Sequence, residues 1–287
     1  MEPVLHVLKG LVAVTILVSA TVFCCLAIYF FALIRLIAPI RRARSALTGT
    51  MDGVVTCWVA VNAWILRSLR LIEIETTIKG NLSDRSNWWI VTSNHQSWSD
   101  VILIQILLLK LAPPIKFFTK KELIWVPFVG FAMWLLRFPY VQRPVRSSGR
   151  GNSGTYETNK RNLSRASAQF LERPITVLSF LEGTRFTEKK HLKQESPFRH
   201  LLLPRTGGLL FTIDALNTKT STIVDLTLNY TGAVPGFWDL LCGRCKKVNV
   251  LIQPIAVSDD FQSNPKEFVF DLWERKDERL EKLRSSK

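Results

Sequence analysis

A long run of uncharged residues near the N-terminus most limits how this chain can fold. From Leu11 to Ile34 the sequence contains 24 residues without one charged side chain. As a helix this run would be roughly 36 Å long, enough to cross a hydrocarbon core about 30 Å thick. A cleaved signal peptide would have a shorter apolar core and a cleavage site with small residues, and the sequence has neither pattern. We therefore expect a retained N-terminal transmembrane helix.

The charges that flank this run predict its orientation. The run is followed by four arginines, Arg35, Arg41, Arg42 and Arg44, whereas Lys9 is the only Lys or Arg before it. Flanking segments rich in Lys and Arg usually stay in the cytoplasm. We therefore expect the rest of the chain on the cytoplasmic face of a membrane, and a bacterial inner membrane is our preferred interpretation.

A second apolar stretch, from Val54 to Leu66, is shorter and less uniform. It contains Asn62 and runs directly into Arg67 and then Arg70. A crossing here would carry the remaining chain to the opposite side of the membrane. We therefore expect this stretch to lie at the membrane interface or against the protein itself.

Composition favours lipid over nucleic acid as the anionic partner. The 287-residue chain carries a formal net charge of +15 and nine tryptophans, and its mean hydropathy is +0.15. A basic surplus of this kind suits nucleic acid, anionic lipid or a phosphorylated substrate. The Arg and Lys residues are spread over loops and membrane-proximal segments, without a helix-turn-helix, zinc-finger or RNA-binding aromatic pattern. We therefore expect membrane lipids as partners and no nucleic acid.

The five cysteines do not indicate a metal site. Cys242 and Cys245 form a single C-x-x-C pair, which cannot supply four ligands, and no histidine is close to them in sequence. Unpaired thiols are usual in a reducing cytoplasm. We expect neither a metal ion nor another cofactor.

Beyond residue 80, apolar β-rich runs alternate with helix-like segments. The expected strands are Trp88–Thr92, Ile115–Phe118, Ile175–Leu181, Ile223–Tyr230 and Val248–Val257. The expected helices are Val101–Leu111, Tyr156–Leu171, Leu209–Leu216 and Pro265–Leu283. This alternation predicts an α/β fold with a mostly parallel sheet flanked by helices. Residues 142–167 are rich in Gly, Ser and Arg and are expected to form an exposed basic loop that leads into a helix.

The polar cluster "NHQSWSD" separates an expected strand from an expected helix. Within it, His95 precedes Asp100 by five positions. Active sites of α/β sheets commonly lie where a strand ends and a helix begins. Asp100 could accept a hydrogen bond from one imidazole nitrogen and make the other a better base. Alternatively, Asp100 could simply stabilise the first turn of the helix, and Asn94, Ser97 and Ser99 could cap it.

Further along the chain, two more expected strands and one helix are bordered by residues suited to anions. "FLEGTR" follows a buried strand, where Gly183 permits a tight turn and Arg185 offers a planar fork to a phosphate. Arg143 follows the apolar stretch "FPYV", and Lys120 lies within "KFFTKKEL". Pro204 and a glycine pair precede a helix in "LPRTGG". A surface Arg after a turn remains the simpler interpretation of Arg185 taken alone.

Taken in this order, these segments resemble the four sequence blocks of the glycerolipid acyltransferases, the lysophosphatidic acid acyltransferases and their relatives. The blocks are "NHQSWSD", "KKELIWVPFVGFAMWLLRFPYVQR", "FLEGTR" and "LPRTGG", and the resemblance extends over roughly residues 55 to 285. The C-terminal "FVFDLWERKDERLEKL" resembles a branch that contains lysophosphatidic acid and lysocardiolipin acyltransferases, including its bacterial membrane members. Leu181 stands where many members have Pro, which leaves the Glu and Arg of that block intact.

The resemblance implies a role for each matching residue. His95 would be the general base and Asp100 would orient it. The acceptor phosphate would be bound by Arg143, Glu182, Gly183 and Arg185, with Lys120 as a lesser candidate, and Pro204 would lie in the acyl-donor region.

The resemblance also implies a domain organisation and an activity. Residues 1–45 would form the anchor and its basic flank, 46–80 a membrane-proximal helical segment and 81–287 the catalytic domain. The implied reaction moves an acyl group from acyl-coenzyme A or acyl-carrier protein to the sn-2 hydroxyl of lysophosphatidic acid, in phospholipid biosynthesis. The alternatives are an acyltransferase that remodels lysocardiolipin or lysophosphatidylglycerol, and a non-catalytic membrane scaffold.

Overall fold

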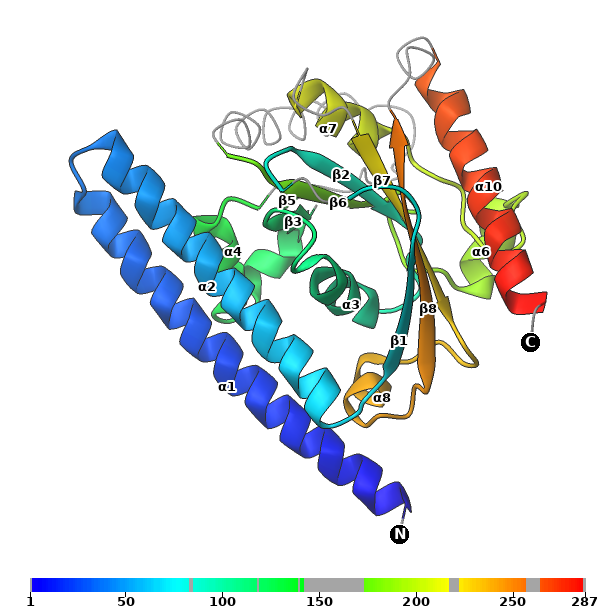
Figure 1. Cartoon of the computed structure of the whole chain (residues 1–287), viewed down its shortest axis with the longest axis horizontal. Helices are drawn as coiled ribbons and strands as arrows, with labels where there is room; N and C mark the ends of the chain where they lie inside the picture. The colour runs from blue at the N-terminus through cyan, green and yellow to red at the C-terminus, as the bar shows by residue number, and fades with distance from the viewer. Residues whose placement is uncertain are drawn as a thin grey trace.

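A six-stranded sheet forms the centre of the computed structural model (Figure 1), which describes residues 2–82, 85–117, 119–138, 140–141, 173–216, 222–256 and 264–285. The strands lie in the order β1-β8-β7-β2-β6-β3. They are β1 (Glu73–Ile78), β2 (Trp89–Ser93), β3 (Ile115–Phe117), β6 (Thr176–Phe180), β7 (Thr222–Tyr230) and β8 (Lys247–Ala256). Each pair of neighbours is parallel except β7 and β8, which are antiparallel. The expected α/β fold with a mostly parallel sheet is confirmed.

The remaining elements are helices and one small strand pair. The helices are α1 (Glu2–Ile37), α2 (Arg41–Ser68), α3 (Ser99–Leu108), α4 (Val129–Leu135), α6 (Glu188–Gln194), α7 (Gly207–Leu216), α8 (Phe237–Leu241), α10 (Pro265–Ser285) and the 3-10 helix η1 (Lys121–Trp125). The strand pair joins β4 (Thr119–Lys120) to β5 (Tyr140–Val141). The helix expected at Tyr156–Leu171 and the whole of the expected basic loop, residues 142–167, lie outside the described residues.

Strand β2 is at the centre of the fold because both of its faces are covered. All five of its residues are buried. Ile90 packs with apolar side chains of α7 and α10, whereas its neighbour Val91 packs with those of α3. Successive side chains of a strand point to opposite faces, so a strand buried on both faces reads as a continuous apolar run. Figure 1 shows α3 on one side of the sheet and α10 on the other.

Strand β1 was not expected from the sequence, and it changes the division of the chain. Its hydrogen bonds run to β8 at the edge of the sheet, from Glu73 opposite Lys247 to Ile78 opposite Ile252. Most of its side chains are exposed, which explains why "EIETTI" lacks the apolar signal of a buried strand. The boundary expected after residue 80 assigns β1 to the helical segment, whereas the structure places it in the sheet.

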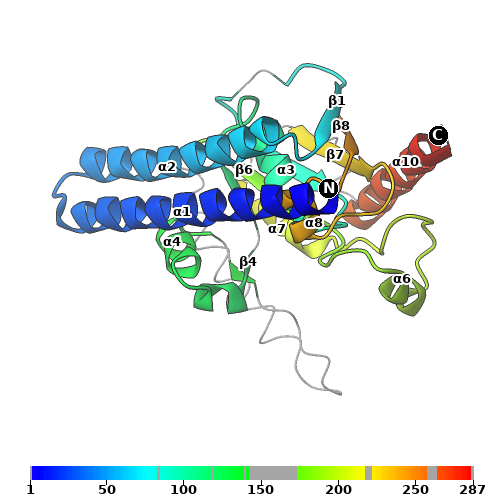
Figure 2. The same cartoon turned by 90° about the horizontal axis from the view of Figure 1, so that it is seen from below.

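Helices α1 and α2 form an antiparallel hairpin that lies along the α/β domain (Figures 1 and 2). Helix α2 is longer than the apolar stretch on which the expectation rested, because its basic first half is helical as well. Its residues Val59, Ala63 and Leu66 are buried, so the stretch expected at the interface or against the protein does contact the protein. A buried ion pair between Lys116 Nζ, on β3, and Asp52 Oδ1, on α2, at 2.8 Å fixes the hairpin to the sheet.

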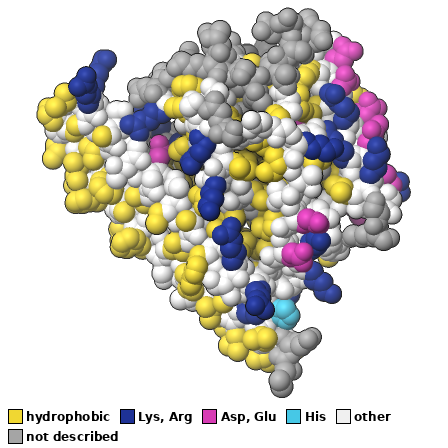
Figure 3. All heavy atoms as spheres, in the orientation of Figure 1, with side chains coloured by type: hydrophobic (Ala, Val, Ile, Leu, Met, Phe, Trp, Pro, Cys, Tyr) yellow, Lys and Arg dark blue, Asp and Glu magenta, His cyan; other side chains and the backbone are white. Residues whose placement is uncertain are grey.

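The outer surface of the hairpin is apolar. Exposed hydrophobic side chains on α1 include Phe23, Phe30 and Leu33, and Figure 3 shows hydrophobic side chains along the edge where α1 and α2 lie. Both helices are long and apolar enough to cross a membrane by length and composition. Large exposed apolar surfaces of this kind mark membrane or protein contacts, and the two apolar helices indicate membrane association.

A buried charge cluster joins α10 to the sheet on the opposite face. Asp225, on β7, pairs with Lys276 Nζ at 2.6 Å and with Arg279 Nη1 at 2.7 Å, and it accepts a hydrogen bond from Thr92. Burial alone would raise the pKa of Asp225, but Lys276 and Arg279 hold that pKa below its ordinary value. Lys276 also donates to the Leu226 carbonyl at 2.7 Å.

Replacing Lys276 should therefore destabilise the fold. Lys276→Met keeps much of the apolar stem but leaves the buried Asp225 carboxylate with one cation fewer, and it should lower the free energy of unfolding by about 3 kcal/mol. Urea unfolding in detergent, followed by tryptophan fluorescence, measures this. Lys266→Ala, on the exposed side of the same helix, is the control; equal midpoints for the two variants would contradict the prediction.

Candidate active site

His95 and Asp100 lie at the junction of β2 and α3. The strand ends at Ser93, the connecting turn contains His95, and Asp100 lies in the first turn of α3. The Nδ1 atom of His95 is 2.9 Å from Asp100 Oδ2. The two side chains that the sequence singled out are therefore in direct contact.

The Asp100 carboxylate is fully buried and accepts hydrogen bonds on both oxygens. Besides His95, Oδ2 accepts from the backbone N–H groups of Gln96 at 2.6 Å and Ser97 at 2.8 Å. Oδ1 accepts from the Tyr230 hydroxyl at 2.6 Å. Burial and the neighbouring Asp100 raise the pKa of Tyr230 well above its ordinary value, which keeps its hydroxyl protonated as a donor. These contacts fix the carboxylate in one orientation.

This arrangement determines which nitrogen of His95 can act as a base. An ionised carboxylate only accepts hydrogen bonds, so Asp100 requires the proton on Nδ1 and leaves the lone pair on Nε2. No described residue hydrogen-bonds to Nε2. The ring stacks on Phe180, the last residue of β6, with centroids 4.0 Å apart. The imidazole is held by a carboxylate at one nitrogen and by an aromatic face, and Nε2 remains available.

Glu182 joins three separate segments of the site. Its Oε1 accepts from the backbone N–H of His95 at 2.8 Å, and its Oε2 accepts from that of Leu202 at 3.1 Å. The same loop is linked a second time, because the N–H of Phe186 donates to the His95 carbonyl at 2.7 Å. Glu182 has no exposed surface. The family resemblance implied that Glu182 binds phosphate; in the structure its carboxyl group is buried, accepts from two backbone N–H groups of the site and does not face solvent.

The turn after Glu182 contributes one exposed guanidinium group, that of Arg185, and the segment before α7 brings a second, that of Arg205, against Gly183. Gly183 has φ of +64°, a conformation that other residues rarely adopt, and a Cβ there would lie 3.0 Å from Arg205 Cδ. Arg185 lies over the ring of Trp98, with its guanidinium carbon 4.8 Å from the ring centroid. Both arginines are exposed. The loop therefore places positive charge close to the His95 turn.

Neither serine of the first block is arranged as a nucleophile. Ser97 is 3% exposed, and its hydroxyl donates to the Pro235 carbonyl. Ser99 is fully buried, and its hydroxyl has no hydrogen-bond partner among the described residues. The Ser97 hydroxyl also accepts from the N–H of Ser99 at 3.1 Å, but the N-cap residue of α3 is Trp98, and no side chain caps the helix from that position.

Of the other expected site residues, the structure describes Pro204 fully, Lys120 in its backbone only, and Arg143 not at all. Pro204 is half-buried beside Arg205, whose N–H donates to the Leu181 carbonyl at 2.7 Å and so links the fourth block to the third. Lys120 belongs to β4, directly after β3, and its side chain lies outside the described part. Arg143 also lies outside the described residues. Within the described residues, no group of three or more His, Cys, Asp or Glu side chains could hold a metal ion.

Three residues of the site were not identified from the sequence. Tyr230 ends β7, 130 positions from Asp100, and only its place at the end of an apolar strand hinted at a role. Phe180 looked like an ordinary core residue. Arg205 was part of the quoted fourth block, but nothing in its spacing indicated that it would lie against Gly183.

Glu182 should make the protein less stable as the pH rises. Burial raises the pKa of Glu182 from 4.5 to about 8, although the N–H donors of His95 and Leu202 and the Lys276 ammonium oppose the shift. Between these two values the folded state holds a proton that the unfolded chain has lost. The free energy of unfolding should therefore fall by roughly 1 kcal/mol per pH unit in this window and level off above it.

Unfolding in detergent at about pH 5 and about pH 8 tests this prediction. Glu182→Gln removes the titrating group, so the stability difference between the two proteins should shift in favour of the variant as the pH rises. If the free energies of unfolding of wild type and variant change with pH in parallel, the raised pKa of Glu182 is contradicted.

Comparison with known proteins gives relatives for both sequence and fold. A family model described as Acyltransferase matches residues 56–224. Among curated proteins, 1-acyl-sn-glycerol-3-phosphate acyltransferase gamma from Mus musculus is 26% identical over 155 residues, and the delta form from Homo sapiens is 27% identical over the same length. Each match covers 50% of this chain and 38% of the relative, so this chain matches well under half of their length.

A solved structure shares the fold over nearly the whole chain. It is the 1-acyl-sn-glycerophosphate (LPA) acyltransferase PlsC from Thermotoga maritima, with a TM-score of 0.57, 18% identity and coverage of 98% of both chains. At this identity the likeness concerns the fold alone. The family model, however, spans more than half of the sequence and includes the His95–Asp100 pair and the Glu182–Arg185 turn, so this protein belongs to the Acyltransferase family.

Proposed function

We propose that this protein is a membrane-bound acyltransferase that transfers a fatty acyl group to the sn-2 hydroxyl of lysophosphatidic acid and makes phosphatidic acid. The donor is acyl-coenzyme A or acyl-carrier protein, used as a co-substrate, and no other cofactor is invoked. The observation that carries the proposal is the contact between His95 Nδ1 and Asp100, which leaves Nε2 unbonded among the described residues beside a turn that bears Arg185.

His95 has the geometry of a general base for this reaction. Its Nε2 takes the proton from the acceptor hydroxyl, and the hydroxyl oxygen attacks the carbonyl carbon of the thioester. The new C–O ester bond forms, the C–S bond breaks, and the leaving thiolate takes the proton back from the imidazolium. Asp100 stabilises the imidazolium and holds the ring. No covalent acyl-enzyme is needed, because the acceptor itself is the nucleophile.

The acceptor phosphate is assigned to the turn after β6. Arg185, two residues after Gly183, and Arg205, which lies against Gly183, are both exposed, and a guanidinium can bind phosphate through two parallel hydrogen bonds. We propose Arg185 and Gly183 as direct contacts, with Arg143 and Lys120 as further phosphate ligands and Pro204 as part of the acyl-donor region. Glu182 contributes by positioning His95 through its backbone N–H, as its buried contacts indicate.

The membrane setting follows from the hairpin. Two apolar helices and exposed aromatic side chains, including Trp125, Phe128, Phe131 and Trp134, are suited to lipid, where the proposed lysophospholipid acceptor resides. The arginines at the start of α2 lie at the turn of the hairpin, whereas the other end of α1 contacts the α/β domain, where His6 hydrogen-bonds to the Cys242 carbonyl at 2.7 Å. We keep the cytoplasmic face of a bacterial inner membrane as our proposal for the catalytic domain. A remodelling enzyme for lysocardiolipin or lysophosphatidylglycerol would use the same base. The terminal phosphate of lysophosphatidic acid, however, is more accessible to the exposed guanidinium groups than the phosphate of a lipid with a bulky headgroup.

Removing the base should abolish most acyl transfer. His95→Ala should lower kcat at least roughly 100-fold, since general-base catalysis contributes about that much or more. Asp100→Asn should also lower kcat strongly, because the amide no longer selects the same tautomer of His95. The assay uses the full chain in detergent, labelled acyl-coenzyme A and a panel of lysophospholipids.

Ser97→Ala serves as the control, because its hydroxyl contacts Pro235 and not His95. It should retain most of the activity of the wild type. Activity in His95→Ala together with its loss in Ser97→Ala would reverse the assignment of roles. If the wild type transfers no acyl group to any lysophospholipid, the enzymatic proposal fails and the scaffold alternative gains support.

Removing Arg185 should weaken acceptor binding more than it slows chemistry. Loss of one charge-assisted contact should raise KM for lysophosphatidic acid about 10- to 100-fold in Arg185→Ala, with KM for the acyl donor nearly unchanged. Arg275→Ala, an exposed change on α10, is the matched control. An unchanged KM in Arg185→Ala, or a preference for lysocardiolipin in the wild type, would contradict this acceptor assignment.

A further inference from the structure

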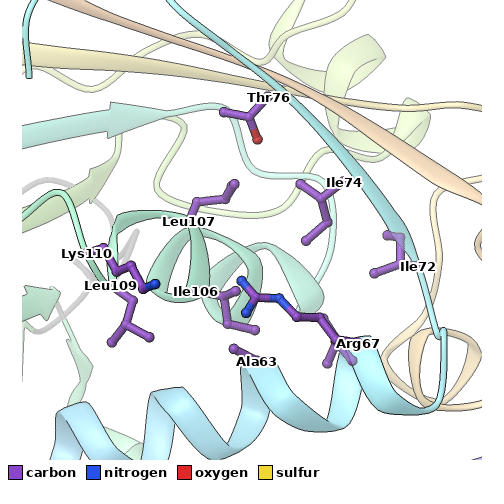
Figure 4. A pocket seen from close by; sticks show the side chains of 10 residues that line it. Ala63, Arg67, Ile72, Ile74, Thr76, Ile106, Leu107, Leu109 and Lys110 are labelled. Atoms are coloured by element: carbon purple, nitrogen blue, oxygen red, sulfur yellow. The ribbon is translucent and has the colours of Figure 1, made fainter.

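A cavity lies between the hairpin and the edge of the α/β domain, apart from the His95 site. It has a volume of about 370 Å³ and is lined by residues from the C-terminal end of α2, from β1 and from the end of α3 (Figure 4). Its walls are largely aliphatic and include Leu66, Ile72, Ile74 and Ile106. A cavity of this size and polarity is within the range of small-molecule and lipid sites.

Two cations converge on this apolar cavity. Figure 4 shows the side chains of Arg67, from α2, and Lys110, after α3, extending towards each other on either side of Ile106. Both residues are exposed, and neither forms an ion pair or side-chain hydrogen bond within the described part of the chain. The cavity lining contains no acidic residue. The site therefore combines two free positive charges with an apolar floor.

The cavity lies next to surfaces that suit a lipid interface. Helix α2, which supplies Arg67, is one of the two helices apolar enough to cross a membrane. One turn earlier on this helix, Trp64 is 58% exposed, and Trp beside Arg is typical of the headgroup level. Figure 3 shows a row of Lys and Arg side chains beside the hydrophobic edge of the molecule.

The cavity does not belong to the acyl-transfer site. Asp100 lies in the first turn of α3, whereas the cavity is lined by Ile106, Leu107, Leu109 and Lys110, at the other end of the helix. Along the axis, Asp100 and Ile106 are roughly 9 Å apart. No residue that we assign to catalysis or to acceptor binding lines the cavity.

We propose that this cavity binds an anionic membrane phospholipid as a second lipid site. The headgroup phosphate lies between Arg67 and Lys110, and part of one acyl chain lies against the aliphatic walls. A neutral or zwitterionic lipid provides less complementary charge, so the site favours anionic headgroups. Cations near helix C-termini are also favoured by the helix dipole, but that effect does not explain why two of them converge on one apolar cavity.

Lipid binding by the full-length protein tests the proposal. The purified protein in a neutral detergent is titrated with dioleoyl phosphatidylglycerol or with dioleoyl phosphatidylcholine, and bound lipid is counted by native mass spectrometry. The wild type should hold one phosphatidylglycerol more tightly than any phosphatidylcholine. Arg67→Ala/Lys110→Ala should weaken that binding at least roughly tenfold, since two charge-assisted contacts are lost.

The control removes the same charge elsewhere. Lys189→Ala/Lys193→Ala changes two exposed lysines on α6, which does not line the cavity, and it should leave phosphatidylglycerol binding unchanged. If the control weakens binding as much as Arg67→Ala/Lys110→Ala does, the effect is one of net charge and the proposal fails. Equal binding of the two lipids by the wild type also overturns it.

A variant that fills the cavity separates the apolar part of the site from its charges. Ile106→Trp keeps Arg67 and Lys110 but occupies space between them, and it should also weaken phosphatidylglycerol binding about tenfold. Retained acyl transfer in this variant verifies that the fold and the His95 site are intact. Unchanged phosphatidylglycerol binding by Ile106→Trp would show that the lipid does not enter the cavity.

Discussion

The buried carboxylate of Glu182 connects the parts of the chain on which the site depends. It receives the backbone N–H of His95 on one oxygen and that of Leu202 on the other, so the ends of β2 and β6 and the segment before α7 are held together. Neither N–H lies within a sheet ladder, and each would otherwise be a buried donor without a partner. The position of the His95 turn therefore depends on a side chain 87 residues away.

Two buried carboxylates support this turn in different ways. Asp100 is surrounded by an imidazole, two backbone N–H groups and the Tyr230 hydroxyl, whereas Glu182 receives two backbone N–H groups. Burial dominates at Glu182 and raises its pKa to about 8. Different surroundings thus allow one carboxyl group to orient the imidazole and the other to hold the backbone.

The apolar hairpin of α1 and α2 is attached to the sheet that carries the His95 site. Its ion pair between Asp52 and Lys116 is buried, so the hairpin is fixed to the sheet and does not extend freely from it. Exposed aromatic residues around η1 and α4 extend the apolar surface on the side of α1, where Tyr29 donates to the Phe128 carbonyl. These apolar side chains suit the lipid acceptor that we propose.

The sequence by itself determined the features that depend on near neighbours in the chain. Alternating apolar runs predicted five of the strands in the main sheet, and the short span from His95 to Asp100 predicted their contact across one strand-to-helix turn. The uncharged run from Leu11 predicted α1. These features follow from periodicity and local spacing, which do not require knowledge of distant segments.

Only the tertiary structure decided the features that depend on distant partners. It placed Tyr230 on Asp100, turned the Glu182 carboxylate inward to backbone donors, brought Arg205 against Gly183 and added the exposed strand β1 to the sheet. It also brought Arg67 and Lys110 to one cavity. The partners of these groups are far away in sequence, and the packing of the sheet against the helices determines which of them meet.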